Sequence, residues 1–216
     1  MKQQETTKQR ILESAKQLFA QQGYDKTSIR SLAIEAQVSH GLIRHYFGNK
    51  EQVWYAVADL IIAEVMNERI ELNDYFQHNF RANDATYLMI SKMLDNLVDN
   101  PLIMKLVIQF SLGQQLHFDY FFNQVLLINK DLRVLIEQCS EENYLKSMNA
   151  AEIINMLYGM VSMPAAQPKL FIANYEQEID HKVAIKHYLQ SVKSLFANLL
   201  QVNEQAIIAK VEQLKA

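Results

Sequence analysis

Several residue types are scarce in this sequence, and each scarcity argues against a class of protein. A single cysteine, Cys139, cannot form an internal disulfide, so we expect a reducing, cytoplasmic setting. No apolar run approaches the roughly 20 residues that span a bilayer. The opening MKQQETTKQR also lacks the apolar segment of a secretory signal. We therefore expect neither a membrane association nor a disulfide-stabilised secreted domain.

Glycine and proline are also rare, with five and three copies in 216 residues. Alternation of apolar and polar residues, which marks a half-buried strand, does not persist anywhere. The apolar residues instead recur at helical spacing, as in Ile11, Leu12, Ala15, Leu18 and Phe19. We predict an all-α fold, in which closely spaced glycines divide the first 48 residues into short helices.

The predicted helices follow from caps and apolar spacing. The first begins near Thr6 or Thr7 and ends at Gly23, and the second begins after Thr27 as the N-cap. The third is short and lies between Ser39 and Gly48. The remaining helices are expected at about 50–74, 85–100, 101–113, 115–138, 148–163, 181–201 and 204–215, with an irregular stretch at 164–180 that follows Pro164.

The charge is unevenly distributed along the chain. Residues 1–50 carry eight Lys/Arg and four Asp/Glu, a balance of +4, whereas the remainder carries 13 and 20, a balance of −7. A basic segment on an acidic body predicts that the N-terminal part meets a polyanion. Chance surface charge is the simpler alternative.

The short helix expected at 40–47 has two different faces. At 100° per residue, Ile43 and Phe47 point to one side, which predicts packing against the first two helices. The opposite side is compact, positively biased and rich in donors, and it consists of His40, Gly41, Leu42, Arg44 and His45. Such a face suits the major groove of DNA, where arginine can donate two hydrogen bonds to guanine and an apolar side chain can touch the thymine methyl.

Two short helices joined by a tight turn, the second polar on its outer side, are typical of a helix-turn-helix. We expect Gly41 to allow close approach to DNA, and Tyr46 and the amides that begin the second and fourth helices to meet phosphates. An ordinary three-helix unit with a solvated polar face would give the same helical wheel. The charge asymmetry favours DNA over that alternative.

Residues 6–57, TTKQRILESAKQLFAQQGYDKTSIRSLAIEAQVSHGLIRHYFGNKEQVWYAV, strongly resemble the DNA-binding domain of the TetR-type transcriptional regulators. The similarity is carried by ILESAKQLFAQQGY, KTS, VS-x-G, HYF and NKE. It implies that Thr27 and Ser28 meet the DNA backbone, that Tyr46 ends the recognition helix, and that Lys50 touches phosphate. It also implies that the groove-facing residues are Ser39, His40, Leu42, Arg44 and His45.

The sequence departs from the family pattern at three positions. Gln37 stands where a glycine is usual in the turn, Leu42 where Thr or Ala is frequent, and Arg44 where an aromatic residue is common. We therefore expect an operator preference of its own.

The resemblance implies two domains: a helix-turn-helix domain at 1–50, and a helical effector-binding and dimerisation domain at 51–216, linked by the helix that starts at about residue 50. The second part is rich in Met and aromatic residues, which line adaptable apolar pockets but also make ordinary cores. We predict a small-molecule effector without a cofactor. The candidate effector-binding residues are Met93, Met104, Phe110, Gln114, His117, Phe121 and Met156. A homodimer is expected through about 149–163 and 181–201.

Catalysis is not expected, because no constellation of reactive residues is present. Glu178 and His181 have the spacing of half a di-metal site, but a second Glu-x-x-His is missing, so no metal site is predicted. Cys139 has no evident activating partner. One alternative remains open: the C-terminal part could bind a protein rather than a small molecule, using the apolar residues of the segment 164–180.

Overall fold

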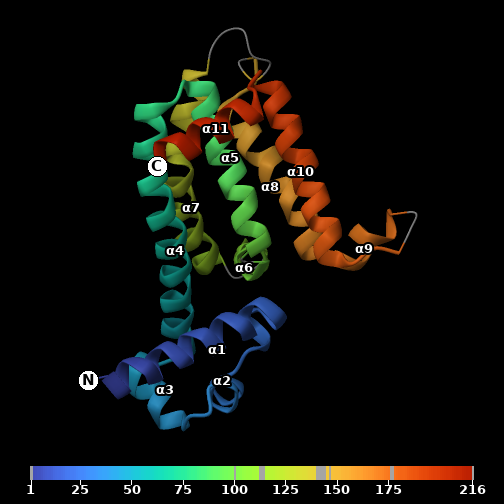
Figure 1. Cartoon of the computed structure of the whole chain (residues 1–216). Coiled ribbons are helices and arrows are strands. Elements are labelled where there is room, and N and C mark those ends of the chain that lie inside the picture. The colour runs from blue at the N-terminus through green and yellow to red at the C-terminus, as the bar shows by residue number, and fades with distance from the viewer. Residues whose placement is uncertain are drawn as a thin grey trace. The chain divides into compact units, whose positions relative to one another are not determined.

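The structure is a computed structural model that describes residues 2–99, 101–111, 115–139, 145, 147–175 and 178–215. Within these ranges the regular secondary structure is entirely helical, which confirms the predicted all-α class (Figure 1). The helices are α1 (Lys2–Lys26), α2 (Ile29–Glu35), α3 (His40–Phe47), α4 (Lys50–Asn79), α5 (Ala82–Asp99), α6 (Pro101–Ser111), α7 (Gln115–Gln138), α8 (Ala150–Ala166), α9 (Pro168–Ala173), α10 (His181–Leu199) and α11 (Glu204–Lys215).

The chain forms two compact units that differ from a simple division at residue 50. The first contains Met1–Met66 and Leu102–Leu126, and the second contains Asn67–Pro101 and Leu127–Ala216. Helices α4 and α7 therefore each contribute to both units. The first unit thus contains α6 and the first half of α7 in addition to α1–α3. The expected boundary between a DNA-binding domain and an effector-binding domain at residue 50 stays a prediction.

A single apolar core joins the helices of the first unit. The stripe of α1 contributes Ile11, Ala15 and Phe19, each fully buried, and α6 contributes Leu106 and Phe110. These side chains fall on one face of each helix because helical neighbours recur every three or four residues. Val53, Trp54 and Val57 of α4 belong to the same core, which therefore packs α1 against both α4 and α6.

The kink near the C-terminal end of α1 requires a glycine. Gly23 has φ 79° and ψ 174°, a region that only glycine occupies readily. The hydroxyl of Thr27 donates to the carbonyl oxygen of Gly23 at 2.8 Å and so closes the turn. The sequence predicted that Gly23 interrupts the helix, and the backbone angles confirm it.

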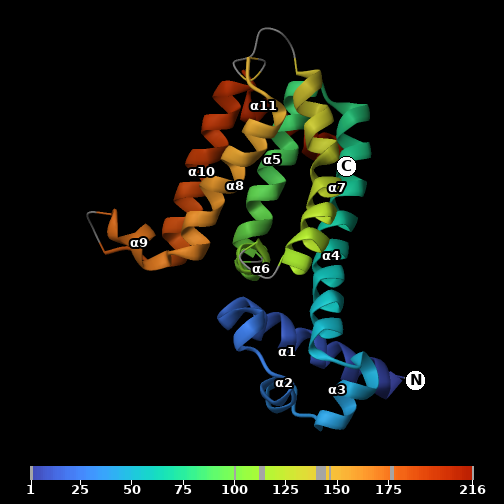
Figure 2. The same cartoon turned by 180° about the vertical axis from the view of Figure 1, so that it is seen from behind.

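In the second unit, α5, α8 and α10 lie side by side (Figures 1 and 2). The Lys193 ammonium of α10 lies 2.6 Å from the Asp95 carboxylate of α5. The Tyr188 hydroxyl of α10 donates to the Met160 carbonyl of α8 at 2.9 Å. These contacts tie α10 to the two neighbouring helices.

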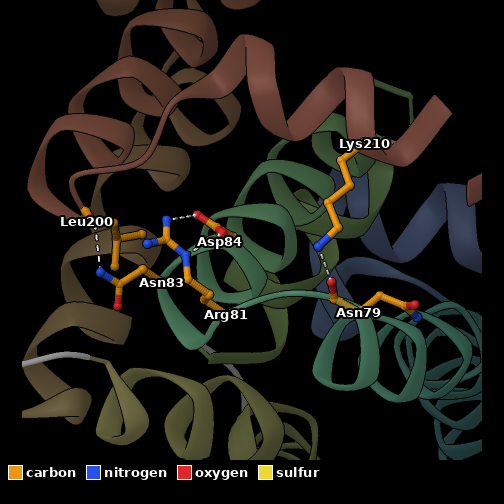
Figure 3. A network of polar contacts seen from close by, with 6 residues as sticks. All are labelled: Asn79, Arg81, Asn83, Asp84, Leu200 and Lys210. Carbon is orange, nitrogen blue, oxygen red and sulfur yellow. Dashed lines mark hydrogen bonds and ion pairs between the residues drawn. The ribbon is translucent and has the colours of Figure 1, made fainter. Parts of the chain in front are cut away.

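The C-terminal helix α11 is held against the turn between α4 and α5 (Figure 3). The Lys210 ammonium donates to the Asn79 carbonyl at the last residue of α4, and the Asn83 amide donates to the Leu200 carbonyl at 3.0 Å. The Tyr87 hydroxyl donates to the Glu204 carboxylate at 2.7 Å. A cation that meets the exposed carbonyls at a helix C-terminus also complements the helix dipole.

Most predicted helices are present, with differences at their ends. Helix α4 continues to Asn79 rather than residue 74, and α8 passes through Pro164 to Ala166. The prediction of an irregular stretch at 164–180 is wrong for residues 164–166 and for α9. A proline lacks the amide that an interior helical residue donates, but the helix can pass it when packing holds the turn, and Pro164 is buried. Among the described residues, no helix is long and apolar enough to cross a membrane.

Candidate nucleic-acid interface

The short helix α3 is held at both ends by its caps. The Ser39 hydroxyl accepts the Leu42 amide at 3.3 Å, and Gly48, with φ 81°, donates its amide to the Arg44 carbonyl at 2.8 Å. Serine at the N-cap and a residue of positive φ after the last turn are the usual ends of a helix. The predicted bounds of this helix, including both caps, are confirmed.

The two faces of α3 are separated as the helical wheel predicted. Ile43 is fully buried and Phe47 nearly so, and both belong to the core of the first unit. The opposite face is exposed and contains His40, Gly41, Leu42, Arg44 and His45. Leu42 is 38 % exposed, so it adds an apolar surface among the donors. This face contributes nothing to the core and is available to a partner.

The start of α2 differs from the prediction in one residue. The N-cap is Ser28 rather than Thr27: the Ser28 hydroxyl accepts the Ser31 amide at 3.0 Å, and the Ser31 hydroxyl accepts the Ser28 amide at 2.9 Å. Thr27 is buried, and its hydroxyl is engaged with Gly23. Ser28 therefore remains at the surface beside the amides of α2, whereas the Thr27 side chain holds the turn.

Lys50 begins α4 and is positioned by Tyr24. Its ammonium donates to the Tyr24 carbonyl at 3.1 Å and lies 3.9 Å from the centroid of the Tyr24 ring. The same carbonyl accepts the Thr27 amide at 3.0 Å. One carbonyl oxygen therefore fixes both the start of α2 and the lysine that opens α4. No local sequence signal indicates this role of Tyr24, although Tyr24 lies directly after Gly23 within the stretch that resembles the TetR-type domain.

The basic charge of the N-terminal segment is only partly free. Lys16 pairs with Glu64 at 2.9 Å, and the charge of Lys50 lies over an aromatic ring. Several other cations are exposed and lie on α1, α2 and α3: Lys8, Arg10, Lys26, Arg30 and Arg44. The excess of exposed cations over anions in this segment can attract a polyanion over the distance of a Debye length, about 8–10 Å.

Three of the predicted effector-binding residues gather in the first unit around Trp54. The rings of Phe110 and His117 lie 4.6 and 4.3 Å from the Trp54 ring. Phe121 meets Phe110 edge-on at 5.0 Å. These residues form a continuous aromatic cluster with the core of the helix-turn-helix.

The other predicted effector-binding residues are distributed more widely. Met104 is buried on α6, Met93 is half-buried on α5, and Met156 on α8 is 38 % exposed. Gln114 lies outside the described residues. The role of all these residues in binding an effector stays a prediction.

A tyrosine of α7 reaches α4 near the aromatic cluster. The Tyr120 hydroxyl donates to the Asp59 carboxylate. Burial, and next the hydrogen bond to Asp59, raise the pKa of Tyr120 to about 12, so the phenol stays a donor at physiological pH. This contact ties α7 to α4 within the first unit.

Residues 11–57 match a family model described as "Bacterial regulatory proteins, tetR family". The HTH-type transcriptional repressor Rv3405c of Mycobacterium tuberculosis is 47 % identical over 49 residues, which are 23 % of this chain and 26 % of that protein. The HTH-type transcriptional repressor AcnR of Corynebacterium diphtheriae is 37 % identical over 94 residues, which are 40 % of this chain and 50 % of that protein. The chain thus matches between about a quarter and a half of the length of these relatives.

Solved structures resemble the chain over nearly its whole length. The TetR family transcriptional regulator PfmR from Thermus thermophilus has a TM-score of 0.65 at 16 % identity, over 90 % of this chain and 96 % of that one. A regulatory protein in the tetR family from Rhodococcus has a TM-score of 0.64 at 15 % identity, over 88 % of this chain and 96 % of that one. At such low identity the likeness establishes the shared fold.

Proposed function

Since the chain carries the N-terminal domain and the fold of the tetR family of bacterial regulatory proteins, we propose that it is a DNA-binding transcriptional regulator of the cytoplasm. The observation that carries this proposal is the arrangement of α3. Its outer face is exposed and does not pack against the core, whereas Ile43 and Phe47 on its inner face are buried in the core. Arg44 and the two exposed histidines supply donors for base edges, and Ser28 and Lys50 lie where two helices begin. The regulator acts as a repressor, as the matched relatives of Mycobacterium and Corynebacterium are named.

The operator is read by a homodimer. Along α8 the exposed residues Glu152, Asn155, Met156 and Gly159 recur at helical spacing, and on α10 Val183 and Leu195 are exposed. These faces of α8 and α10 supply the subunit contact. A two-fold dimer presents two copies of α3 about one DNA turn apart, ~34–36 Å, and so reads a near-palindrome.

A small, largely apolar effector releases the repressor from DNA. The effector binds the conformation with misplaced recognition helices more tightly than the conformation that binds DNA. The loss of DNA-binding free energy equals the difference between the effector's binding free energies for these two conformations. The competing idea, a protein partner at 164–180, loses one of its anchors, because Phe171 of α9 is buried against Tyr175 and Tyr188. Leu170 remains 52 % exposed.

The proposal is tested by selecting bound fragments from random double-stranded DNA with the purified full chain. We expect a near-palindromic consensus with two half-sites about one turn apart. Sedimentation at micromolar concentration is expected to show a dimer. If no sequence were enriched, the proposal of a DNA-binding regulator would be refuted. If the protein were a monomer, the proposal of an operator with two half-sites would be refuted.

Arg44 is then tested by two substitutions on the selected site. Arg44→Ala is expected to cost ~1–3 kcal/mol and to relax preference at one base pair. Arg44→Lys keeps the charge but loses the planar fork, so it should also lose specificity. If Arg44→Lys bound the site as well as the unsubstituted protein does, Arg44 would be a phosphate contact rather than a base-reading residue.

A further inference from the structure

One histidine of α7 is buried among aromatic rings that belong to α1 and α4. The side chain of His117 is 2 % exposed. Its ring stacks on Trp54 at 4.3 Å with an interplanar angle of 19°, and it meets Tyr24 edge-on at 4.4 Å and Tyr55 at 6.0 Å. Its Nδ1 atom is buried and has no hydrogen-bond partner among the described residues. A buried polar atom without a partner is uncommon and calls for an explanation.

The surroundings of His117 favour the neutral imidazole. Burial lowers the pKa of His117, because the charged form loses its hydration, and Lys50 lowers it further. Glu51, whose carboxylate oxygen lies 4.0 Å from Nε2, and Asp25 oppose this shift. The other titratable groups that face the ring are the phenols of Tyr24 and Tyr55. Burial is the largest of these influences, so a proton on His117 destabilises the packed arrangement.

The tyrosine whose ring contacts His117 also binds the elements that face the DNA. Tyr24 meets His117 through its ring, and its carbonyl accepts both the Lys50 ammonium and the Thr27 amide. The path from His117 to the proposed phosphate contact at Lys50 therefore passes through one residue. Gln109 of α6 adds a second contact at this place, because its side-chain oxygen lies beside Gly23.

We propose that His117 is a positioning residue through which protonation controls DNA binding. Neutral His117 packs between Tyr24 and Trp54 and keeps Tyr24, Lys50 and the start of α2 in the arrangement that meets the DNA backbone. Protonated His117 favours a looser packing of α7 in which its ring meets water and Glu51. The proposal rests on the proposed function, because its outcome is a change in DNA affinity.

The direction with pH follows from the lowered pKa. The stabilisation by the neutral ring is fully present above the ordinary histidine pKa of about 6.5, and it is lost as the pH falls through the lower value of the packed state. Acidification should therefore weaken DNA binding through His117.

The first test needs no DNA. Trp54 is the sole tryptophan, so its fluorescence reports directly on the ring stacked against it. A protonated imidazole quenches indole emission, so emission should fall with a midpoint below pH ~6.5. His117→Phe keeps a ring at this position and cannot titrate, so its emission should be constant over the same range. His78→Gln, which removes an exposed histidine of α4, should titrate like the unsubstituted protein. A titration that persists in His117→Phe would overturn the assignment.

The second test measures the dissociation constant for the selected operator between pH 7.5 and 5.5. The dissociation constant of the unsubstituted protein is divided by that of His117→Phe at each pH, so that pH effects unrelated to His117 cancel in the ratio. We expect this ratio to rise several-fold on acidification, up to about tenfold for each unit by which the pKa of His117 differs between the two packings. His117→Gln, also neutral at every pH, should behave like His117→Phe and covers the case in which one variant fails to fold.

The outcomes separate the two proposals. A constant ratio, together with a normal fluorescence titration, would show that His117 titrates without affecting DNA, and the coupling would be wrong. Absence of DNA binding at every pH would refute the proposed function, and the control of DNA binding would fall with it. A rising ratio with a titration that disappears in both neutral variants would establish the role of His117.

Discussion

Substitution of Gly23 by alanine tests whether the kink near the end of α1 sets the placement of α2 and α3. The backbone at Gly23, with φ 79° and ψ 174°, lies in a region that costs a residue with a Cβ atom ~1–3 kcal/mol. The new Cβ would also lie 2.7 Å from the Gln109 side-chain oxygen. That oxygen ends a flexible side chain, so it can rotate away for about 0.5–1.5 kcal/mol at most. We expect Gly23→Ala to lower the free energy of unfolding by ~1–3 kcal/mol, mainly through the backbone.

Urea unfolding of four variants and the unsubstituted protein separates the contribution of the backbone from that of the Gln109 contact. Gln109→Ala alone removes the crowded atom, and Gly23→Ala with Gln109→Ala should still lose most of the stability. Gly48→Ala is the matched control: Gly48 has φ 81°, and an added Cβ there would meet nothing within 4 Å. If Gly23→Ala stayed within about 0.5 kcal/mol of the unsubstituted protein, the positive φ would not be enforced. If Gln109→Ala removed the whole loss, the contact rather than the backbone would be responsible.

Three further substitutions test other parts of the molecule. Gly41→Ala replaces an exposed glycine inside α3, where an added Cβ meets only ordinary contacts, so urea unfolding should show about 0.5–1 kcal/mol more stability while gel-shift assays show weaker operator binding. Equal or tighter binding would contradict the close approach of α3 to DNA. Lys50→Ala should weaken all DNA sequences alike and lower the slope of log affinity against log salt by about one, whereas substitution of the exposed Lys130 of α7 by alanine should leave this slope unchanged. Asp180→Ala removes the acceptor of two amides in the first turn of α10, so unfolding should become easier by about 0.5–2 kcal/mol; an unchanged stability would show that the cap is dispensable.

Much of the N-terminal part could be predicted because its signals are local. Ser39, Gly48 and the burial of Ile43 and Phe47 follow from cap preferences and a period of 3.6 residues. Helix α7 was predicted with the bounds it has, because its apolar pattern is long. The N-cap of α2 was placed one residue early, since Thr27 and Ser28 have equivalent capping chemistry and only the burial of Thr27 separates them.

The missed features depend on contacts between distant parts of the chain. The aromatic content of 110–121 predicted an apolar environment, but no periodicity indicates that His117 stacks on Trp54, 63 positions earlier. Tyr24 was missed for the same reason, because its role consists of a carbonyl and a ring that meet Lys50 and His117. Two prolines close together predict an irregular segment at α9, although Pro168 is well placed at the beginning of a helix.

The separation of tasks on α3 has a practical consequence for retargeting the protein to a new DNA site. Its five outward positions, 40, 41, 42, 44 and 45, are exposed, whereas Ile43, Phe47 and the two caps hold the helix in place. A combinatorial library at these five codons would therefore vary the chemistry of the DNA-facing surface without changing the buried residues and caps that stabilise α3. Each member of the library would keep the contacts of Tyr24 with Lys50 and Thr27, and it would keep His117. Variants with altered DNA specificity and unaltered regulation could therefore be obtained from one set of clones.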